Sequence, residues 1–343
     1  TLLEGLKIKN FKQAEIIDQI ISKDDERRSL QVKTNELQSE MNQLSKEIGK
    51  LFKQGETEEA NKAKEKTSAI KKSLETLEKD LQESAQQLNE MIVQVPNLPH
   101  PSVPSGFSEA DNKLIREGGT MPELDEQALP HWELGKKYKL IDFDLGVKIT
   151  GAGFPVFRGN GARLQRALIS YFLEENTAAG YEEILPPLLV NEDSGFGTGQ
   201  LPDKEGQMYH ATADNLYLIP TAEVPVTNIY RDVILDAGDL PIKNTAYTPC
   251  FRREAGSYGK DVRGLNRVHQ FDKVEIVQIQ HPSKSYAALE EMVNHVEKLV
   301  ISLGLPYRIV QLCGGDLSFT SALTYDFEVY SAAQKRWLEV SSV

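Results

Sequence analysis

Arginine, glutamate and phenylalanine side chains gather in residues 248–278, TPCFRREAGSYGKDVRGLNRVHQFDKVEIVQ, between two apolar segments. Arg252 and Glu254 stand two positions apart, so a strand would present a guanidinium and a carboxylate on one face. A guanidinium holds phosphate or carboxylate through paired hydrogen bonds, and a glutamate accepts hydrogen bonds from an amine. The pattern predicts a hairpin that binds a polyanion. The alternative is a surface hairpin with ordinary ion pairs.

The flanking segments must bring these side chains together. Apolar and polar positions alternate in residues 270–278, which predicts a strand with Phe271, Lys273 and Glu275 on one face. The intervening loop, AGSYGKDVRG, has three glycines, which permit turn geometry. Lys260 and Arg263 are expected to extend outward from this loop.

The string FRREAGSYGKDVRGLNRVHQFDKVE resembles motif 2 of class II aminoacyl-tRNA synthetases, in the form found in seryl-tRNA synthetases. Five further segments resemble landmarks of that family, in one order along the chain: HPSVPSG (100–106), GTGQLP (197–202), TAEVPVT (221–227), TYDFEVY (324–330) and LEVSS (338–342). Several ordered matches are far more specific than one motif. By this resemblance the chain is identified as a member of the seryl-tRNA synthetase family.

The resemblance implies a serine–tRNA ligase. Such an enzyme activates L-serine with ATP to seryl-adenylate and transfers the seryl group to the 3′-terminal adenosine of tRNA(Ser), and by extension of tRNA(Sec). Adenylation requires in-line attack on the α-phosphate, which a protein promotes by positioning the reactants and neutralising charge. The implied catalytic residues are Arg252, Glu254 and Glu275.

Each residue of the implied ATP site suits its role. Arg252 would bind the α-phosphate and the serine carboxylate, Glu254 the adenine amino group, and Phe271 the flat adenine ring. Arg263 and Arg267 are further candidates for phosphate or tRNA contact. The implied ATP-binding residues are Arg252, Arg253, Glu254, Val268, Phe271, Glu339, Val340, Ser341 and Ser342.

The residues implied for serine binding are Thr221, Ala222, Glu223, Arg252 and Glu275. Two carboxylates beside one small cavity favour an amine, and a hydrogen-bonding site rejects alanine because its polar groups would be left unpaired. The alternative for Glu223 and Glu275 is a structural salt bridge with Arg252.

An oxygen-ligand site for Mg²⁺ is expected at Glu339 and Ser342, by resemblance to positions that bind the ATP phosphates through magnesium. Asp326 or Glu328 is the alternative acidic partner. The sequence has no zinc pattern of cysteine and histidine, so no zinc is expected.

A long helical hairpin is predicted for residues 24–93, which contain no proline. Leucine-class residues recur at heptad spacing, with a gap around Gly49 and Gly55. Roughly 30 residues per helix would give an arm about 45 Å long. The first helix carries this pattern at Leu30, Leu37, Met41, Leu44, Ile48 and Leu51, and the second at Ala60, Ala63, Thr67, Ile70, Leu74, Leu77, Leu81, Leu88 and Ile92.

Lysines gather near the turn of this arm, whereas its base is richer in glutamate. In the family that the chain resembles, the arm holds the long variable arm of the serine tRNA and reads its shape. The alternative is a coiled coil for dimerisation or spacing. The lysines expected to contact RNA are Lys46, Lys50, Lys53, Lys62 and Lys64.

The predicted fold is α+β: an antiparallel coiled-coil hairpin followed by a class II catalytic domain, a mainly antiparallel sheet flanked by helices. We expect a tRNA-binding domain at 1–95, a proline-rich linker at 96–107 and the catalytic domain at 108–343. The helix expected at 162–180 and a strand ending at prolines, with Pro187, resemble motif 1, which implies a homodimer.

Composition favours a soluble cytoplasmic protein with two buried thiols, Cys250 and Cys313, and no membrane segment. The chain has 343 residues, 40% of them hydrophobic, and a net charge of −12, so RNA would bind only at local basic patches. Motif 3 is expected tens of residues beyond Val343, so we expect the sequence to be part of a longer chain. The alternative function is a non-catalytic relative that binds tRNA or another partner through the arm.

Overall fold

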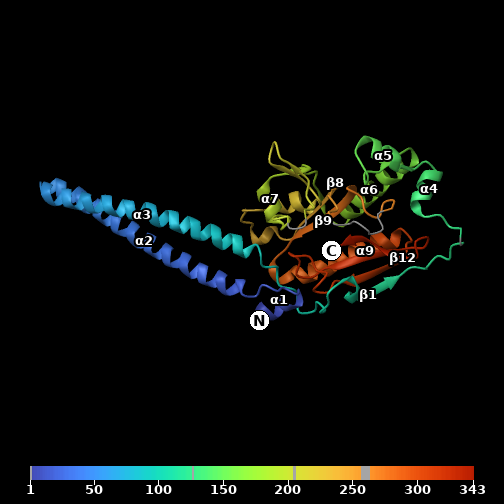
Figure 1. The fold of residues 1–343 in the computed structure, drawn as a ribbon, viewed down its shortest axis with the longest axis horizontal. Helices are drawn as coiled ribbons and strands as arrows, with labels where there is room; N and C mark the ends of the chain where they lie inside the picture. The colour runs from blue at the N-terminus through green and yellow to red at the C-terminus, as the bar shows by residue number, and fades with distance from the viewer. Residues whose placement is uncertain (1, 126, 204–205, 256–262) are drawn as a thin grey trace. The chain divides into compact units, whose positions relative to one another are not determined.

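The computed structural model describes residues 2–125, 127–203, 206–255 and 263–343. Lys260, which was expected to extend from the hairpin loop, lies outside these ranges. The chain divides into two compact units, Thr1–Leu98 and Pro99–Val343. Figure 1 shows the chain coloured from its N-terminus to its C-terminus.

The first unit is helical, with α1 (Leu2–Ile8), α2 (Ile16–Gln54) and α3 (Thr57–Ile92). The two long helices pack against each other along their length (Figure 1). The predicted heptad positions form the seam, because Ala60, Ile70 and Leu74 are buried whereas their neighbours are exposed. Gly55 ends α2 at φ +81°, a conformation that glycine adopts without steric cost. The predicted antiparallel hairpin is therefore confirmed.

The second unit contains a four-stranded antiparallel sheet in the order β1–β10–β11–β12. These strands are β1 (Lys113–Gly118), β10 (Tyr307–Gln311), β11 (Tyr325–Ser331) and β12 (Arg336–Ser342). Helix α9 (Ser285–Ser302) covers one face, where its Val293 and Val300 pack on Ile309 and Phe327. Apolar burial there leaves the opposite face, which carries Asp326, for chemistry.

A second sheet holds the predicted hairpin strands, β8 (Ile242–Phe251) and β9 (Gln270–Ile279). Helix α6 (Asn160–Ala178), the expected motif 1 helix, covers one face, where the Asn176 amide donates to the Thr245 hydroxyl at 2.8 Å. The prediction of a strand running to the prolines is wrong in extent, because β4 is only Glu182–Glu183. That strand pairs parallel to β8, one exception to the mainly antiparallel pattern.

Smaller elements complete the unit. They are β2 (Ile141–Asp142), β3 (Val156–Phe157), α4 (His131–Lys137), α5 (Phe143–Ile149), β5 (Leu189–Val190), α7 (Glu192–Gly197), β6 (His210–Ala211), β7 (Leu216–Leu218), α8 (Glu223–Asn228) and the 3₁₀ turns η1 (Glu109–Asp111), η2 (Ala237–Asp239) and η3 (Pro282–Lys284). Cys250 and Cys313 are buried free thiols, as expected. None of the helices in the described ranges has the length and hydrophobicity of a membrane span.

Candidate active site

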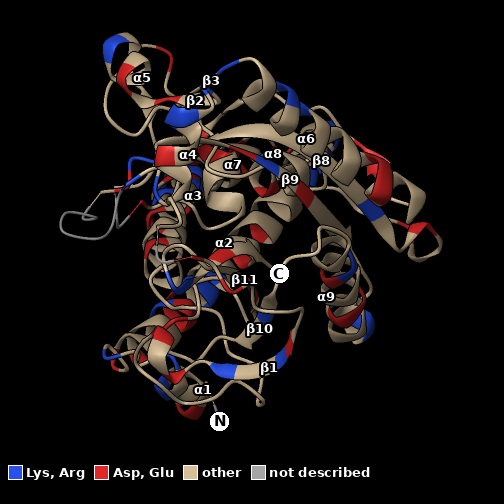
Figure 2. Ribbon diagram, turned by 90° about the vertical axis from the view of Figure 1, so that its right-hand side faces the viewer, with Lys and Arg blue, Asp and Glu red and all other residues tan. Residues whose placement is uncertain are grey.

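Part of the predicted hairpin site lies on the face of β8 and β9 that is opposite to α6. Phe271, Lys273 and Glu275 alternate along β9 with residues that face α6, so their predicted common face is confirmed. Basic and acidic residues follow one another on this strand (Figure 2). On the same face Ala246, opposite Glu275, packs with Ala222, which precedes α8, and with Val226 of α8.

Arg252 and Glu254 do not lie on a strand, and the prediction that placed them there is wrong. Strand β8 ends at Phe251, and only the Arg252 N–H continues the ladder, donating to the His269 carbonyl at 2.9 Å. The next N–H, of Arg253, leaves the hairpin and donates to the Gln207 carbonyl at 2.8 Å. Glu254 then turns the chain at φ +48°, a left-handed conformation outside the extended region of regular strands.

The residues predicted to bind serine meet around one carboxylate. The buried Thr221 hydroxyl donates to Oε2 of Glu275 at 2.7 Å, and Nζ of Lys273 lies 2.8 Å from the same oxygen. The Thr221 hydroxyl oxygen accepts the Glu223 N–H at 3.2 Å. The structure therefore brings Thr221 and Ala222, which precede α8, and Glu223, its first residue, together with Glu275 of β9.

Two carboxyl groups share this region. Glu223 keeps an exposed surface, yet the protein atoms that surround its carboxyl raise its pKa, and the nearby charge of Glu275 raises it further. Lys273 and Arg252 oppose that rise. A cation bound near the two carboxylates would relieve their repulsion.

The described residues do not form the alternative arrangement, a structural salt bridge of Glu223 and Glu275 with Arg252. Glu275 pairs with Lys273, and within the described ranges no ion pair joins Arg252 to Glu223 or Glu275. The Arg252 guanidinium instead lies over the Phe271 ring, 5.2 Å from its centroid. The residues predicted for the α-phosphate and the adenine ring are thus in contact.

Glu254, predicted to hold the adenine amino group, accepts a hydrogen bond from Nη1 of Arg267 at 2.8 Å. This bond joins the two ends of the hairpin loop. Val268 is buried beside it, whereas Arg263 is exposed. Arg253 lies near Gln207, to whose carbonyl its N–H donates. Burial raises the pKa of the nearby Tyr209, and the charge of Arg253 opposes that rise.

A register shift in the other sheet gathers the C-terminal candidates. Ser341 pairs with Phe327, and Glu339 pairs with Glu328, so Val340 is an extra residue with no partner. Residues opposite each other share a face, which puts Glu339 and Ser342 on the side of Asp326 and away from the Phe327 core. Without the shift, two residues three apart would point to opposite faces.

Asp326 is strongly perturbed in this group. Burial and then the Glu339 charge raise its pKa to about 7, although a hydrogen bond with Ser342 opposes the rise. Its Oδ1 is buried and has no hydrogen-bond partner in the described part of the chain. The other alternative, Glu328, is paired with Arg308. Burial also raises the pKa of Glu339, and the positive charge of Arg252 opposes part of that rise.

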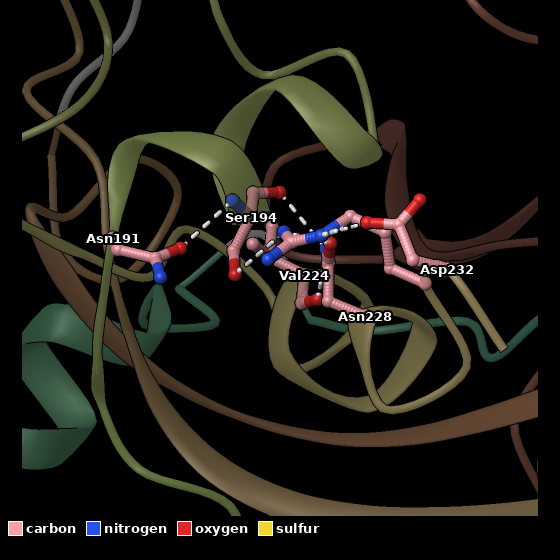
Figure 3. Close-up of polar contacts among 6 residues, drawn as sticks. Asn191, Ser194, Val224, Asn228 and Asp232 are labelled. Atoms are coloured by element: carbon pink, nitrogen blue, oxygen red, sulfur yellow. Dashed lines mark hydrogen bonds and ion pairs between the residues drawn. The ribbon is translucent and has the colours of Figure 1, made fainter. Parts of the chain in front are cut away.

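Asn228, which no motif of the sequence indicated, joins α7 to α8. Its Nδ2 donates to the carbonyls of Ser194, at 2.9 Å, and Val224, at 2.8 Å (Figure 3). Its Oδ1 accepts from Arg231 at 2.7 Å. A Cβ on Gly197 would lie 2.3 Å from that oxygen, so the first glycine of GTGQLP allows this contact. Asn228 thereby fixes α8, which begins at Glu223.

The lysines expected to contact RNA all have exposed side chains. Lys46, Lys50 and Lys53 lie on the last part of α2, and Lys62 and Lys64 lie near the start of α3. Nζ of Lys64 stands 5.0 Å from the ring centroid of Phe52. These charges are accessible to a phosphate backbone.

Two family models match the chain. Residues 2–99 match the seryl-tRNA synthetase N-terminal domain, and residues 208–343 match the tRNA synthetase class II core domain (G, H, P, S and T). The chain is 48% identical over 340 residues to a serine–tRNA ligase of Salinibacter ruber, covering 99% of this chain and 79% of that protein. It is 52% identical to the Geobacter sulfurreducens serine–tRNA ligase over 75% of this chain and 61% of that relative.

Solved structures give the same result. The seryl-tRNA synthetase from Pyrococcus horikoshii complexed with ATP superposes with a TM-score of 0.88 at 32% identity, covering 99% of this chain and 81% of that one. The cytoplasmic serine–tRNA ligase from Naegleria fowleri in complex with AMP gives a TM-score of 0.83 at 25% identity, covering 99% and 79%.

Proposed function

The chain belongs to the seryl-tRNA synthetase family of ATP-dependent ligases, and on this premise we propose that the whole protein charges tRNA(Ser) with L-serine. The chain spans 61% of the length of its Geobacter relative, so the proposal concerns the full-length protein. One observation carries it: the Thr221 hydroxyl contacts both the Glu275 carboxylate of β9 and the N–H of Glu223, the first residue of α8.

In this proposal the serine ammonium group lies between the carboxylates of Glu223 and Glu275, and Thr221 contributes its hydroxyl. Ala222, between Thr221 and Glu223 in the sequence, is fully buried and packs on Ala246. Because alanine lacks the hydroxyl, it would leave buried polar groups unpaired, which costs more than losing one apolar contact.

We propose that ATP binds along the hairpin. Arg252 binds the α-phosphate and the serine carboxylate, Phe271 stacks on the adenine, and Glu254 exchanges its bond with Arg267 for the adenine amino group. Arg253, Val268, Val340 and Ser341 complete the ATP site. No covalent nucleophile is required, because these residues position the reactants and neutralise charge.

Glu339 and Ser342 would hold Mg²⁺. The set fits, since it offers oxygen ligands on one face of β12 beside the unpartnered Oδ1 of Asp326. Magnesium supplies neutralising charge to the ATP phosphates when bound.

The coiled-coil arm is proposed to bind the tRNA through its lysines, and tRNA(Sec) would be a second substrate. A homodimer is proposed through the motif 1 region, where Leu185 is 86% exposed and Leu164 is 59% exposed. Burial of such side chains between copies would be favourable. The proposed compartment is the cytoplasm.

Serine-dependent exchange of pyrophosphate into ATP by the full-length protein tests the proposal. Exchange with serine supports the ligase. A protein that binds tRNA through its arm yet shows no exchange would support the non-catalytic alternative.

A further inference from the structure

His269 contacts both main-chain polar groups of Arg252. The Arg252 N–H donates to the His269 carbonyl at 2.9 Å, and Nδ1 of His269 lies 3.0 Å from the Arg252 carbonyl oxygen. A carbonyl oxygen only accepts, so we assign the ring hydrogen to Nδ1. One histidine therefore restrains the Arg252 backbone from two directions.

The histidine ring is itself held on several sides. Phe154 stacks on it with ring centroids 5.3 Å apart and planes 12° apart, and the Tyr209 hydroxyl lies 3.1 Å from Nδ1. The Gly153 carbonyl accepts the His269 N–H at 2.8 Å. A Cβ on Gly153, at φ +82°, would lie 2.3 Å from ring atom Cδ2. The ring cannot turn without displacing these neighbours.

Such restraint matters because β8 does not fix Arg252. The strand ends at Phe251, and two residues later the chain turns left-handed at Glu254. The Arg252 guanidinium lies 5.2 Å from the Phe271 centroid, so its place over that ring depends on its main chain being fixed. The Arg252 N–H bond to the His269 carbonyl is the last bond of the ladder, and the Nδ1 bond to the Arg252 carbonyl adds a restraint that the ladder does not supply.

We propose that His269 is a positioning residue for Arg252: its Nδ1–H holds the Arg252 carbonyl and thereby aims the guanidinium at the α-phosphate. This inference rests on the proposed function, because it assigns His269 a part in serine activation.

Two substitutions separate the hydrogen bond from the ring packing. His269→Asn places an amide donor near the position of Nδ1 but loses the stack on Phe154. His269→Phe keeps a ring against Phe154 but has no donor. Each is made in the full-length protein and assayed for thermal unfolding and for serine-dependent ATP–pyrophosphate exchange.

The two readouts should rank the variants oppositely. His269→Phe should be the more stable variant, yet its exchange kcat should fall about tenfold to hundredfold, the cost of a misplacement of ~1 Å. His269→Asn should be less stable but should recover most of the kcat. A purely structural role predicts instead that activity follows stability.

His210→Phe is the matched control. His210 stacks on Tyr217 with centroids 4.2 Å apart and is exposed, so the same change there should leave exchange unaltered. If His269→Phe does not fold, His269→Gln takes its place in the test. The amide of that glutamine reaches the Nε2 position, not the Nδ1 position, so this variant should not recover the exchange kcat.

The inference would be overturned if the unmodified protein catalysed the exchange and His269→Phe or His269→Gln catalysed it equally well. Activity that ranks with stability would do the same. Absence of exchange in the unmodified protein would contradict the proposed function, so the two failures are distinguishable.

Discussion

The Thr221 hydroxyl and the Lys273 ammonium group both contact the same oxygen, Oε2 of Glu275, at 2.7 and 2.8 Å. The three residues come from two segments that are far apart in the chain, and Glu275 is only 16% exposed. The Glu275 carboxylate is therefore held in position by a hydrogen-bond donor and by a cation. A site arranged in this way has a carboxylate ready for a bound ammonium group without rearrangement.

Glu275→Gln should weaken serine binding while ATP binding stays nearly unchanged. The amide keeps the size of the side chain but loses the charge, and a hydrogen bond to a charged group contributes about 1.5–3 kcal/mol. The KM for serine should thus rise on the order of tenfold to a hundredfold in the exchange assay.

Glu291→Gln is the matched control for that change, because Glu291 of α9 is 56% exposed and forms an ion pair with Lys243 of β8. Exposed pairs contribute little, so its KM for serine should be that of the unmodified protein. An equal rise of KM in both variants would contradict the assignment of Glu275.

His295→Gln should reduce the loss of stability in acid. Burial lowers the pKa of His295, whose Nε2 contacts Oδ1 of Asn176 at 2.7 Å. The unfolded chain then binds the proton more readily, so the folding free energy contributed by this group falls as the pH drops below the ordinary histidine pKa of about 6.5.

Glutamine can keep the donor to Asn176 and cannot titrate. Denaturant unfolding at pH 7.5 and pH 5.5 measures the difference. The unmodified protein should lose more stability between these two pH values than His295→Gln does, and equal losses would exclude His295 as the cause.

Ser84→Ala should stabilise the arm. Ser84 lies in the seam of the hairpin with 3% exposure, and its hydroxyl has no hydrogen-bond partner among the described residues. Removing a buried unsatisfied group should raise the free energy of unfolding by about 1 kcal/mol. Ser45→Ala is the control, because Ser45 is exposed and should change stability by less than about 0.5 kcal/mol. Calorimetric melting compares the two, and a destabilised Ser84→Ala would refute the account.

Replacing residues 33–83 of the arm by a short flexible linker should leave serine activation nearly intact and abolish aminoacylation of tRNA. The removed helices contribute to the first compact unit, whereas the residues proposed to bind serine and ATP lie in the second. Exchange and charging assays on one preparation measure both activities. Equal loss of both would mean that the arm supports the fold.

A milder variant changes the exposed lysines near the turn to glutamine: Lys46, Lys50, Lys53, Lys62 and Lys64. Its affinity for tRNA should fall, and the dependence of binding on salt concentration should become less steep, because fewer phosphate contacts release fewer counterions.

Periodic features of the sequence predicted the fold well. The heptad spacing located the seam of α2 and α3, and alternation placed Phe271, Lys273 and Glu275 on one face of β9. Such patterns succeed because each follows from one regular backbone geometry.

Local departures from regular backbone could not be predicted. The extra residue Val340 moves Glu339 and Ser342 to one face, and no spacing rule reveals a bulge. Likewise, alternation placed Glu254 on a strand, whereas its left-handed conformation turns the chain away. The contacts of Asn228 and His269 depend on tertiary packing, although Gly197 signals the close approach of Asn228.

The most direct test of the central claim is serine-dependent ATP–pyrophosphate exchange by the intact native gene product, compared with the same assay on alanine and on the Thr221→Ala variant. We predict exchange with serine, far weaker exchange with alanine, and a marked loss in the variant, because its hydroxyl contacts Glu275. A full-length protein that shows no serine-dependent exchange would contradict the account.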